Sequence, residues 1–259
     1  MTRVLVVGDT IVDENIYCDA SGLSLETPTM KANFMSSDAL LGGASNLASQ
    51  LAKLGVQVDF FSSCTEKYLP FLEGANFNFV GFTSDFKSVK TRFWLSRGGE
   101  KYKYFQLNSL TEFSKKDDIL KKLSESVTLT AYDKVIVSDY RLGLINEDLC
   151  DYVAMNSNFS IGASQLSDND PNYGWFDDFN LIVCNEQEAK FVQRTNGICV
   201  TLGEAGCMLN GKTYRAQKIN AKNVIGAGDA FLAGFCASDG DPDFANSHAK
   251  KYLEELNAK

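Results

Sequence analysis

Five short apolar runs of different sequence occur along the chain, and helical patterns fall between them. A run such as RVLVV at residues 3–7 shows no alternation of apolar and polar positions, which is typical of a strand buried on both faces. This rhythm predicts an α/β fold of three layers, with helices on both faces of a mostly parallel central sheet. The other runs lie at residues 56–61, 134–137, 180–183 and 198–202, and the expected helices lie at residues 44–54, 115–127 and 185–193.

Two segments break this rhythm. Residues 13–36 are polar and rich in turns, and residues 88–108 contain a hairpin pattern around the turn Arg97-Gly98-Gly99-Glu100. We expect the two segments to form a small antiparallel β lid over a site at the carboxyl ends of the parallel strands. Because the sequence contains neither a low-complexity linker nor a repeat, we expect one domain over residues 1–259 with a discontinuous lid.

The charge balance and the histidine content exclude several classes of function. The sequence has 25 Lys and Arg against 33 Asp and Glu, a net charge of −8, which argues against a non-specific nucleic-acid binder. His248 is the single histidine, which argues against catalytic triads and zinc sites that need two or more. A general base in this chain is therefore expected to be a carboxylate.

Cysteine usage and hydropathy indicate a cytoplasmic protein. Seven cysteines are scattered without a CxxC motif, which is typical of reduced thiols. The first apolar run ends at Gly8-Asp9, too early for a signal peptide, and no apolar stretch approaches the ~18 residues of a membrane span. We therefore expect no membrane partner.

The motif Gly226-Ala227-Gly228-Asp229 carries the strongest chemical signal, because it leads directly into the apolar helical string AFLAGF. Its small residues allow backbone N–H groups to converge, and a helix N-terminus adds positive partial charge. Such an anion hole suits a transferring phosphoryl group, and Asp229 beside it could take a proton from an attacking hydroxyl. A helix N-terminus with a stabilising acid and no ligand is the alternative.

The complete string GAGDAFLAGF resembles the C-terminal signature of the PfkB/ribokinase family of carbohydrate kinases. Four further motifs resemble those of the family and follow in its order, although each has an ordinary reading as a loop, a helix cap or a hairpin turn. They are Gly8-Asp9 with Asp13, the string LGGASN at residues 41–46, NEQE at 185–188 and TLGEAG at 201–206. The resemblance implies a ribokinase-like fold and transfer of the ATP γ-phosphoryl to an alcohol group.

The resemblance also implies a role for each matching residue. The catalytic set would be Gly226, Ala227, Gly228 and Asp229, with Asp229 as the base. The substrate side would comprise Asp9, Asp13, Gly42, Gly43, Asn46, Arg92 and Asp139. The nucleotide side would comprise Asn185, Thr201, Gly203, Gly206 and Asn246, and Glu188 would hold Mg²⁺, in our interpretation through water.

Within the family, the heptose 7-phosphate kinases resemble this chain most. The opening residues 9–17, the string LSLETPT at residues 23–29 and the run Ser138-Asp139-Tyr140 carry this likeness. Those kinases phosphorylate O1 of D-glycero-D-manno-heptose 7-phosphate with ATP. Arg92 is the best candidate for the sugar phosphate, since it lies on the lid strand expected to face the site. A kinase for ribose, fructose or fructose phosphate is the alternative, with these residues forming only its lid.

Three departures from the family pattern bear on activity. Asn223-Val224-Ile225 replaces the carboxylate and hydroxyl associated with a monovalent cation, which puts potassium activation in doubt. Tyr140-Arg141-Leu142-Gly143 replaces a Tyr-Gly-Lys-Gly run, and only 24 residues follow Phe235. These departures leave open a catalytically impaired pseudokinase that binds a sugar phosphate or nucleotide, although retention of Asp229 argues against it. An oxidoreductase is excluded because no GxGxxG follows the first run. A homodimer through the lid sheet is a further expectation.

Overall fold

The larger sheet of the computed structural model has nine strands among the described residues, which are 2–111, 113, 116–165, 172–221 and 223–258. Their spatial order is β15-β14-β13-β12-β11-β10-β1-β4-β6, and only β14 and β15, at one edge, run antiparallel to their neighbours. The bounds are β1 Arg3–Gly8, β4 Gln57–Phe61, β6 Asn78–Phe79, β10 Lys134–Asp139, β11 Ser160–Ser164, β12 Leu181–Asn185, β13 Ile198–Thr201, β14 Cys207–Leu209 and β15 Lys212–Tyr214.

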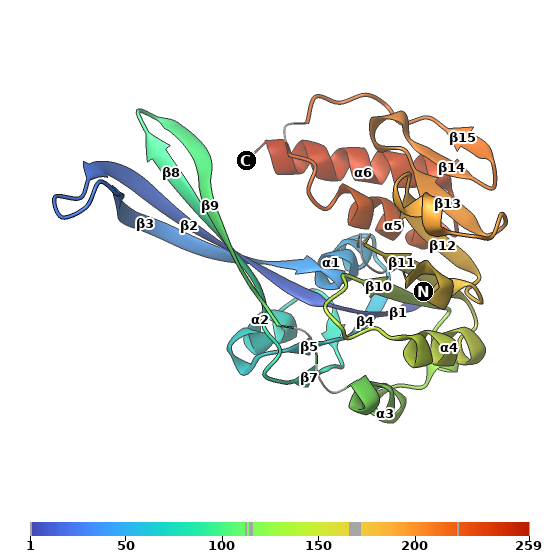
Figure 1. Cartoon of the computed structure of the whole chain (residues 1–259). Coiled ribbons are helices and arrows are strands. Elements are labelled where there is room, and N and C mark those ends of the chain that lie inside the picture. Colours follow the sequence, from blue (N-terminus) through green and yellow to red (C-terminus); the bar gives the residue numbers. More distant parts are fainter. Residues whose placement is uncertain (1, 112, 114–115, 166–171, 222, 259) are drawn as a thin grey trace.

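Helices cover both faces of this sheet, as Figure 1 shows. Helices α1 (Ala44–Lys53) and α5 (Ala227–Ala237) bury apolar residues such as Leu47 and Phe231 against one face, and α6 (Pro242–Asn257) packs on α5. Helices α3 (Lys116–Ser126) and α4 (Glu147–Asn156) cover the other face, where Ile119 and Leu149 are buried. The predicted three-layer α/β architecture is therefore confirmed. The short helices of the chain are η1 Glu66–Tyr68, α2 Leu69–Glu73, η2 Leu129–Ala131, η3 Asn172–Phe176, η4 Glu188–Phe191 and η5 Gly203–Ala205.

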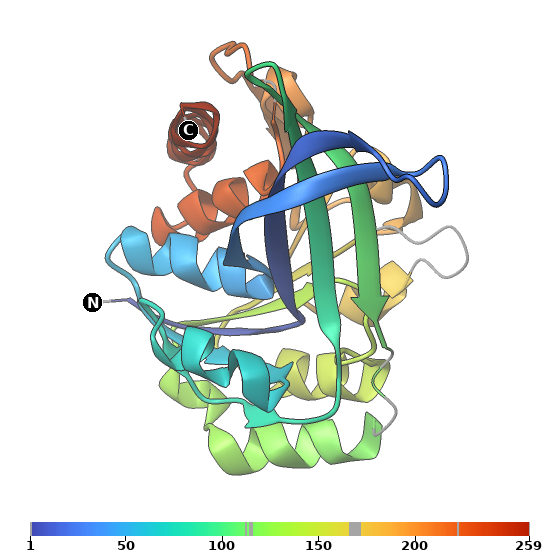
Figure 2. The same ribbon diagram turned by 90° about the vertical axis from the view of Figure 1, so that its left-hand side faces the viewer.

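The smaller sheet forms a lid that projects from the core (Figures 1 and 2). It has the order β3-β2-β8-β9, with β2 Thr10–Leu23, β3 Met30–Gly43, β8 Ser88–Arg97 and β9 Glu100–Leu110. Both hairpins are antiparallel, and a parallel pairing of β2 with β8 joins them. Gly98 and Gly99 have φ of 61° and 86°, as a two-residue hairpin turn of type I′ requires. A two-stranded sheet of β5 (Ser63–Cys64) and β7 (Phe82–Thr83) lies below the lid.

One local expectation was wrong, and one strand was not predicted. The helix expected over residues 185–193 is a single turn, η4, because Arg194 turns the chain back: its guanidinium donates to the carbonyl oxygens of Asn180 and Gly197 at 3.1 and 2.6 Å. Strand β11 has no apolar run, since its residues are SIGAS. A Cβ on Gly162 would lie 2.4 Å from a ring carbon of Phe176, so packing at this strand requires a small residue.

No described helix is both long enough and apolar enough to cross a membrane.

Candidate active site

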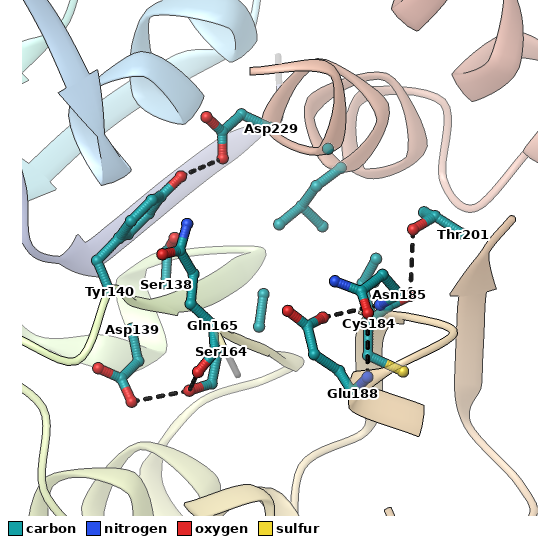
Figure 3. A pocket seen from close by; sticks show the side chains of 14 residues that line it. Ser138, Asp139, Tyr140, Ser164, Gln165, Cys184, Asn185, Glu188, Thr201 and Asp229 are labelled. Atoms are coloured by element: carbon teal, nitrogen blue, oxygen red, sulfur yellow. Dashed lines mark hydrogen bonds between the residues drawn. The ribbon is translucent and has the colours of Figure 1, made fainter. Parts of the chain in front are cut away.

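A cavity of about 180 Å³ opens where the parallel strands end, as the topology of such sheets predicts. The last residues of four neighbouring strands, β10 to β13, line it, and the first turn of α5 closes it (Figure 3). The four strand-final residues are Asp139, Ser164, Asn185 and Thr201, and α5 contributes Gly228 and Asp229.

The glycine turn that begins α5 is tightly packed. Gly226 has a φ of 80°, which favours glycine, and it provides no side chain to cap the helix. A Cβ at this position would lie 2.4 Å from the Tyr252 hydroxyl and 3.0 Å from Nδ2 of Asn46. The turn is therefore enclosed by α1 on one side and by α6 on the other. Ala227 follows as the first residue of α5.

Asp229 receives a hydrogen bond on each carboxylate oxygen. The Tyr140 hydroxyl donates to Oδ1 at 2.6 Å, and Nδ2 of Asn46 donates to Oδ2 at 2.8 Å. Burial raises the pKa of Asp229 above its ordinary value, and both hydrogen bonds oppose that rise. The structure thus brings together Asn46 and Asp229, two predicted site residues that are 183 positions apart in the sequence.

The predicted substrate residues of the lid also meet. Nη1 of Arg92 on β8 lies 2.6 Å from Oδ1 of Asp13 on β2, and both side chains are mostly buried. A Cβ on Gly42 would lie 2.9 Å from Oδ2 of Asp13. Gly43, with a φ of 62°, passes so close to the carbonyl of Asp9 that a Cβ would lie 2.6 Å from that oxygen. The two glycines therefore allow the end of β3 to approach the start of β2.

Asp9 and Asp139 lie beneath Tyr140 and hold its backbone. Oδ2 of Asp9 accepts from the Tyr140 N–H at 2.8 Å, and Oδ1 of Asp139 accepts from the Arg141 N–H at 2.8 Å. The Ser164 hydroxyl donates to Oδ2 of Asp139 at 2.9 Å. Both aspartates are buried, and burial together with the charge of Asp139 raises the pKa of Asp9 to about 7.

Asn185 and Glu188 cap each other's backbone on the far side of the cavity. Oδ1 of Asn185 accepts from the Glu188 N–H at 3.0 Å, and Oε2 of Glu188 accepts from the Asn185 N–H at 2.8 Å. Thr201 donates to the Cys184 carbonyl at 3.3 Å. Within the described ranges, no group of three or more His, Cys, Asp or Glu could hold a metal ion by itself.

Three predicted nucleotide residues do not line this cavity among the described residues. Gly203 begins the η5 turn after β13, and Gly206 directly follows it. Asn246 is buried on α6, and its amide donates to the Tyr214 carbonyl at 3.2 Å. The structure therefore does not bring these three residues into the cavity with Asn185 and Thr201.

Two tyrosines of the site were not predicted. In the sequence Tyr140 stands out only as part of the string Ser138-Asp139-Tyr140, because its contact with Asp229 depends on tertiary structure. Tyr252 lies on the polar helix α6 and donates to the Ile225 carbonyl at 3.1 Å. Spacing could not have identified it, because nothing in the α6 sequence marks one face as belonging to a site.

Comparison with curated proteins finds relatives named bifunctional protein HldE, whereas no family model matches the chain. The chain is 22% identical over 275 residues to HldE of Campylobacter jejuni subsp. jejuni serotype O:6 (strain 81116), covering 92% of this chain and 57% of that protein. It is 26% identical over 270 residues to HldE of Campylobacter fetus subsp. fetus (strain 82-40), covering 91% and 58%. The chain therefore spans somewhat more than half the length of these relatives.

Two solved kinases have the same fold. Arabidopsis thaliana ribokinase complexed with ribose and ATP superposes with a TM-score of 0.66 at 18% identity, covering 98% of this chain and 93% of the other. Phosphofructokinase-2 from Escherichia coli in complex with fructose-6-phosphate gives 0.67 at 12% identity over the whole of both chains. These findings confirm the ribokinase-like fold and the predicted resemblance to the PfkB/ribokinase carbohydrate kinases.

Proposed function

We propose that this chain, a relative of the HldE proteins with the fold of the ribokinase-family carbohydrate kinases, transfers the ATP γ-phosphoryl to a hydroxyl of a sugar or sugar phosphate. One observation carries the proposal. Asp229 lies in the first turn of α5, where it faces the cavity lined by Asn185 and Thr201 on one side and accepts a hydrogen bond from Asn46 of α1 on the other. A carboxylate at that boundary is where a kinase needs its base.

The chemistry follows from these positions. Asp229 accepts the proton of the attacking hydroxyl as that oxygen bonds to the γ-phosphorus, and the bond between this phosphorus and the leaving oxygen of ADP breaks. The Ala227 N–H already donates to the Val224 carbonyl at 3.2 Å, so the N–H groups of Gly226 and Gly228, together with the positive end of α5, would stabilise negative charge on the moving phosphoryl. Asn46 holds the second carboxylate oxygen, so the base keeps one orientation while the hydroxyl approaches.

ATP with Mg²⁺ would supply the phosphoryl group, and the residues present fit that requirement. Mg²⁺ keeps several water ligands and needs few carboxylates when phosphates bind it. Oε2 of Glu188 already accepts a backbone hydrogen bond, so Glu188 would hold the ion through water. Residue 223 is an asparagine, so it offers no carboxylate to a monovalent cation, and its Oδ1 accepts from the Ile225 N–H at 3.1 Å.

For the acceptor we propose heptose 7-phosphate, phosphorylated at O1. The heptose-kinase-like strings of the sequence and the alignment with HldE over 91–92% of this chain support this choice. Arg92 would bind the phosphate of the acceptor, because a guanidinium fork can bond two of its oxygens. Ribose, fructose and fructose 6-phosphate remain alternative acceptors.

The proposal is tested by ADP release from Mg-ATP with heptose 7-phosphate, sedoheptulose 7-phosphate, fructose 6-phosphate, ribose, fructose and adenosine. Turnover with heptose 7-phosphate alone would support both reaction and acceptor, and turnover with another sugar would retain only the reaction. Folded protein that binds ATP without turning over any acceptor would contradict the kinase and favour a pseudokinase. Asp229→Asn serves as the control for contaminating kinases.

We further propose that the protein is a homodimer through the lid sheet. The strand register places Ile16, Phe93 and Phe105 on the face opposite Asp13 and Arg92, and Phe105 is 53% exposed. Exposed apolar residues on such a face favour burial against a second copy. Light scattering should give twice the chain mass, and Phe105→Asp should halve it; a monomeric wild-type protein would contradict the proposal.

A cytoplasmic location completes the proposed function. All seven cysteines are free thiols, and six of them are buried. Unpaired thiols are typical of a reducing compartment, where ATP is also abundant. Fractionation of cells followed by immunoblotting would test this location, and recovery in a secreted or membrane fraction would contradict it.

A further inference from the structure

We propose that Tyr140 is the positioning residue of Asp229, whose hydroxyl fixes one orientation of the carboxylate and favours its proton-accepting, ionised form. This inference rests on the proposed function, because it assigns Tyr140 to the base of the phosphoryl transfer. Tyr140 directly follows strand β10, across the cavity from α5, and the sequence motifs did not place it in the site.

The backbone around Tyr140 is fixed by two buried carboxylates. Asp9 binds the N–H of Tyr140, and Asp139 binds the N–H of Arg141 at 2.8 Å. Arg141 has a φ of 64°, an uncommon conformation for a residue other than glycine. Because the backbone is held at two successive residues, the Tyr140 ring starts from a defined position and reaches across the cavity to α5 (Figure 3).

Tyr140 and Asn46 each donate a hydrogen bond to a different carboxylate oxygen of Asp229. The Tyr140 hydroxyl lies 2.6 Å from Oδ1, and Asn46 Nδ2 lies 2.8 Å from Oδ2. Each carboxylate oxygen has two acceptor positions, so both oxygens retain one for a substrate proton. The pair of donors prevents the carboxylate from rotating, and it orients the remaining acceptor positions before a hydroxyl arrives.

The electrostatic consequence has a clear direction. Burial raises the pKa of Asp229, and the hydrogen bond from Tyr140 is the first of the two contacts that lower it. Burial and the neighbouring Asp229 raise the pKa of Tyr140 well above its ordinary value, so the phenol remains a donor. The other titratable groups around the pair are Asp13 with Arg92 on the lid, Asp9 and Asp139 beneath, Tyr252 on α6 and Glu188 across the cavity.

The test compares Tyr140→Phe, which removes only the hydroxyl, with the matched variant Tyr132→Phe. Tyr132 donates to Oδ2 of Asp59 at 2.7 Å near the opposite end of the sheet, so its loss removes a similar hydrogen bond far from the site. For Tyr140→Phe we expect the acid limb of the kcat profile to move up by about one pH unit. At a pH on that limb, kcat should fall about tenfold, with a smaller loss on the alkaline plateau. Tyr132→Phe should leave the limb in place.

An equal loss of kcat at every pH, or an unmoved acid limb in Tyr140→Phe, would overturn the proposal in favour of a packing role. The carboxyl ¹³C signal of Asp229, assigned with Asp229→Asn, gives a readout that needs no turnover. Its titration midpoint should rise in Tyr140→Phe and stay in place in Tyr132→Phe. If no acceptor is phosphorylated, the proposed function fails while this titration still decides the role of Tyr140. An unmoved midpoint would reject that role even in an active kinase.

Discussion

The glycine turn at Gly226 has two properties that an alanine would disturb: a positive φ and close contacts with α1 and α6. Comparing Gly226→Ala with a control variant separates the two effects. The added methyl group would meet the Tyr252 hydroxyl at 2.4 Å and Nδ2 of Asn46 at 3.0 Å. Gly211, in the turn between β14 and β15, has a φ of 82° against 80° for Gly226, but a Cβ there meets nothing within 4 Å. Gly211→Ala is therefore a matched control that carries the backbone strain without the steric contact.

The expected magnitudes follow from these contacts. An L-residue in the left-handed region costs about 1–2 kcal/mol, which both variants share. Gly226→Ala must also displace Tyr252, whose bond to the Ile225 carbonyl is 3.1 Å long, and the loss of such a bond costs about 1 kcal/mol. We expect the free energy of unfolding to fall by about 2–3 kcal/mol in Gly226→Ala and by about 1–2 kcal/mol in Gly211→Ala.

Urea unfolding monitored by tryptophan fluorescence measures both losses, and turnover adds a second readout. The added methyl group would displace Asn46, which donates a hydrogen bond to Asp229, so kcat should fall by about 10- to 100-fold in Gly226→Ala. In Gly211→Ala, kcat should stay near the wild-type value. Adding Tyr252→Phe to Gly226→Ala should recover part of the lost stability, because the hydroxyl that the methyl meets is gone. Equal stability losses for the two alanine variants would refute the argument that α6 encloses the glycine turn.

Three further predictions concern charged groups. Asp229→Asn should lower kcat by ~10²–10⁴ while calorimetry still detects nucleotide binding; near-normal turnover would remove its role as base. Arg92→Gln should raise KM for a phosphorylated acceptor by about 10- to 100-fold and change KM for an unphosphorylated sugar far less, measured in the same ADP assay; equal effects would assign Arg92 only to its pair with Asp13. The pKa of Asp9 is raised to about 7, so the folded state holds a proton that the unfolded state releases, and stability should fall as pH rises from about 4 to 7. Asp9→Asn should flatten that slope in urea titrations at several pH values, and an unchanged slope would contradict the buried carboxylate pair.

The sequence was most informative where one local rule decides the structure. The run RVLVV became β1, and the glycine pair at 98–99 became the lid turn, because burial on both faces and positive φ values leave residue-level signatures. Strand β11 was not predicted because residues 160–164 lack an apolar run. The ring of Phe176 leaves no room for a side chain at Gly162, and Phe176 lies outside the strand, so the strand's own sequence does not show this requirement.

The candidate site also combines residues that sequence motifs identify with residues that only the structure reveals. Motifs led to Asn46 and Asp229, and the structure places the two side chains in hydrogen-bond contact. They did not lead to Tyr140 or Tyr252, whose roles depend on where the end of β10 and the last turns of α6 meet α5. Contacts between elements far apart in the sequence have no periodicity, so a single sequence does not contain a signal for them.

The parallel pairing of β2 with β8 has a consequence for how the molecule assembles. Parallel neighbours cannot be joined by a tight turn, and the chain between these two strands runs through α1, β4, α2 and the strands below the lid. The central pairing of the lid therefore closes a long loop, and we expect it to form later than the two hairpins. Backbone amides along β2 and β8 should belong to a cooperative unit that opens before the core sheet does, and a ligand bridging Asp13 and Arg92 would join the two hairpins of that unit.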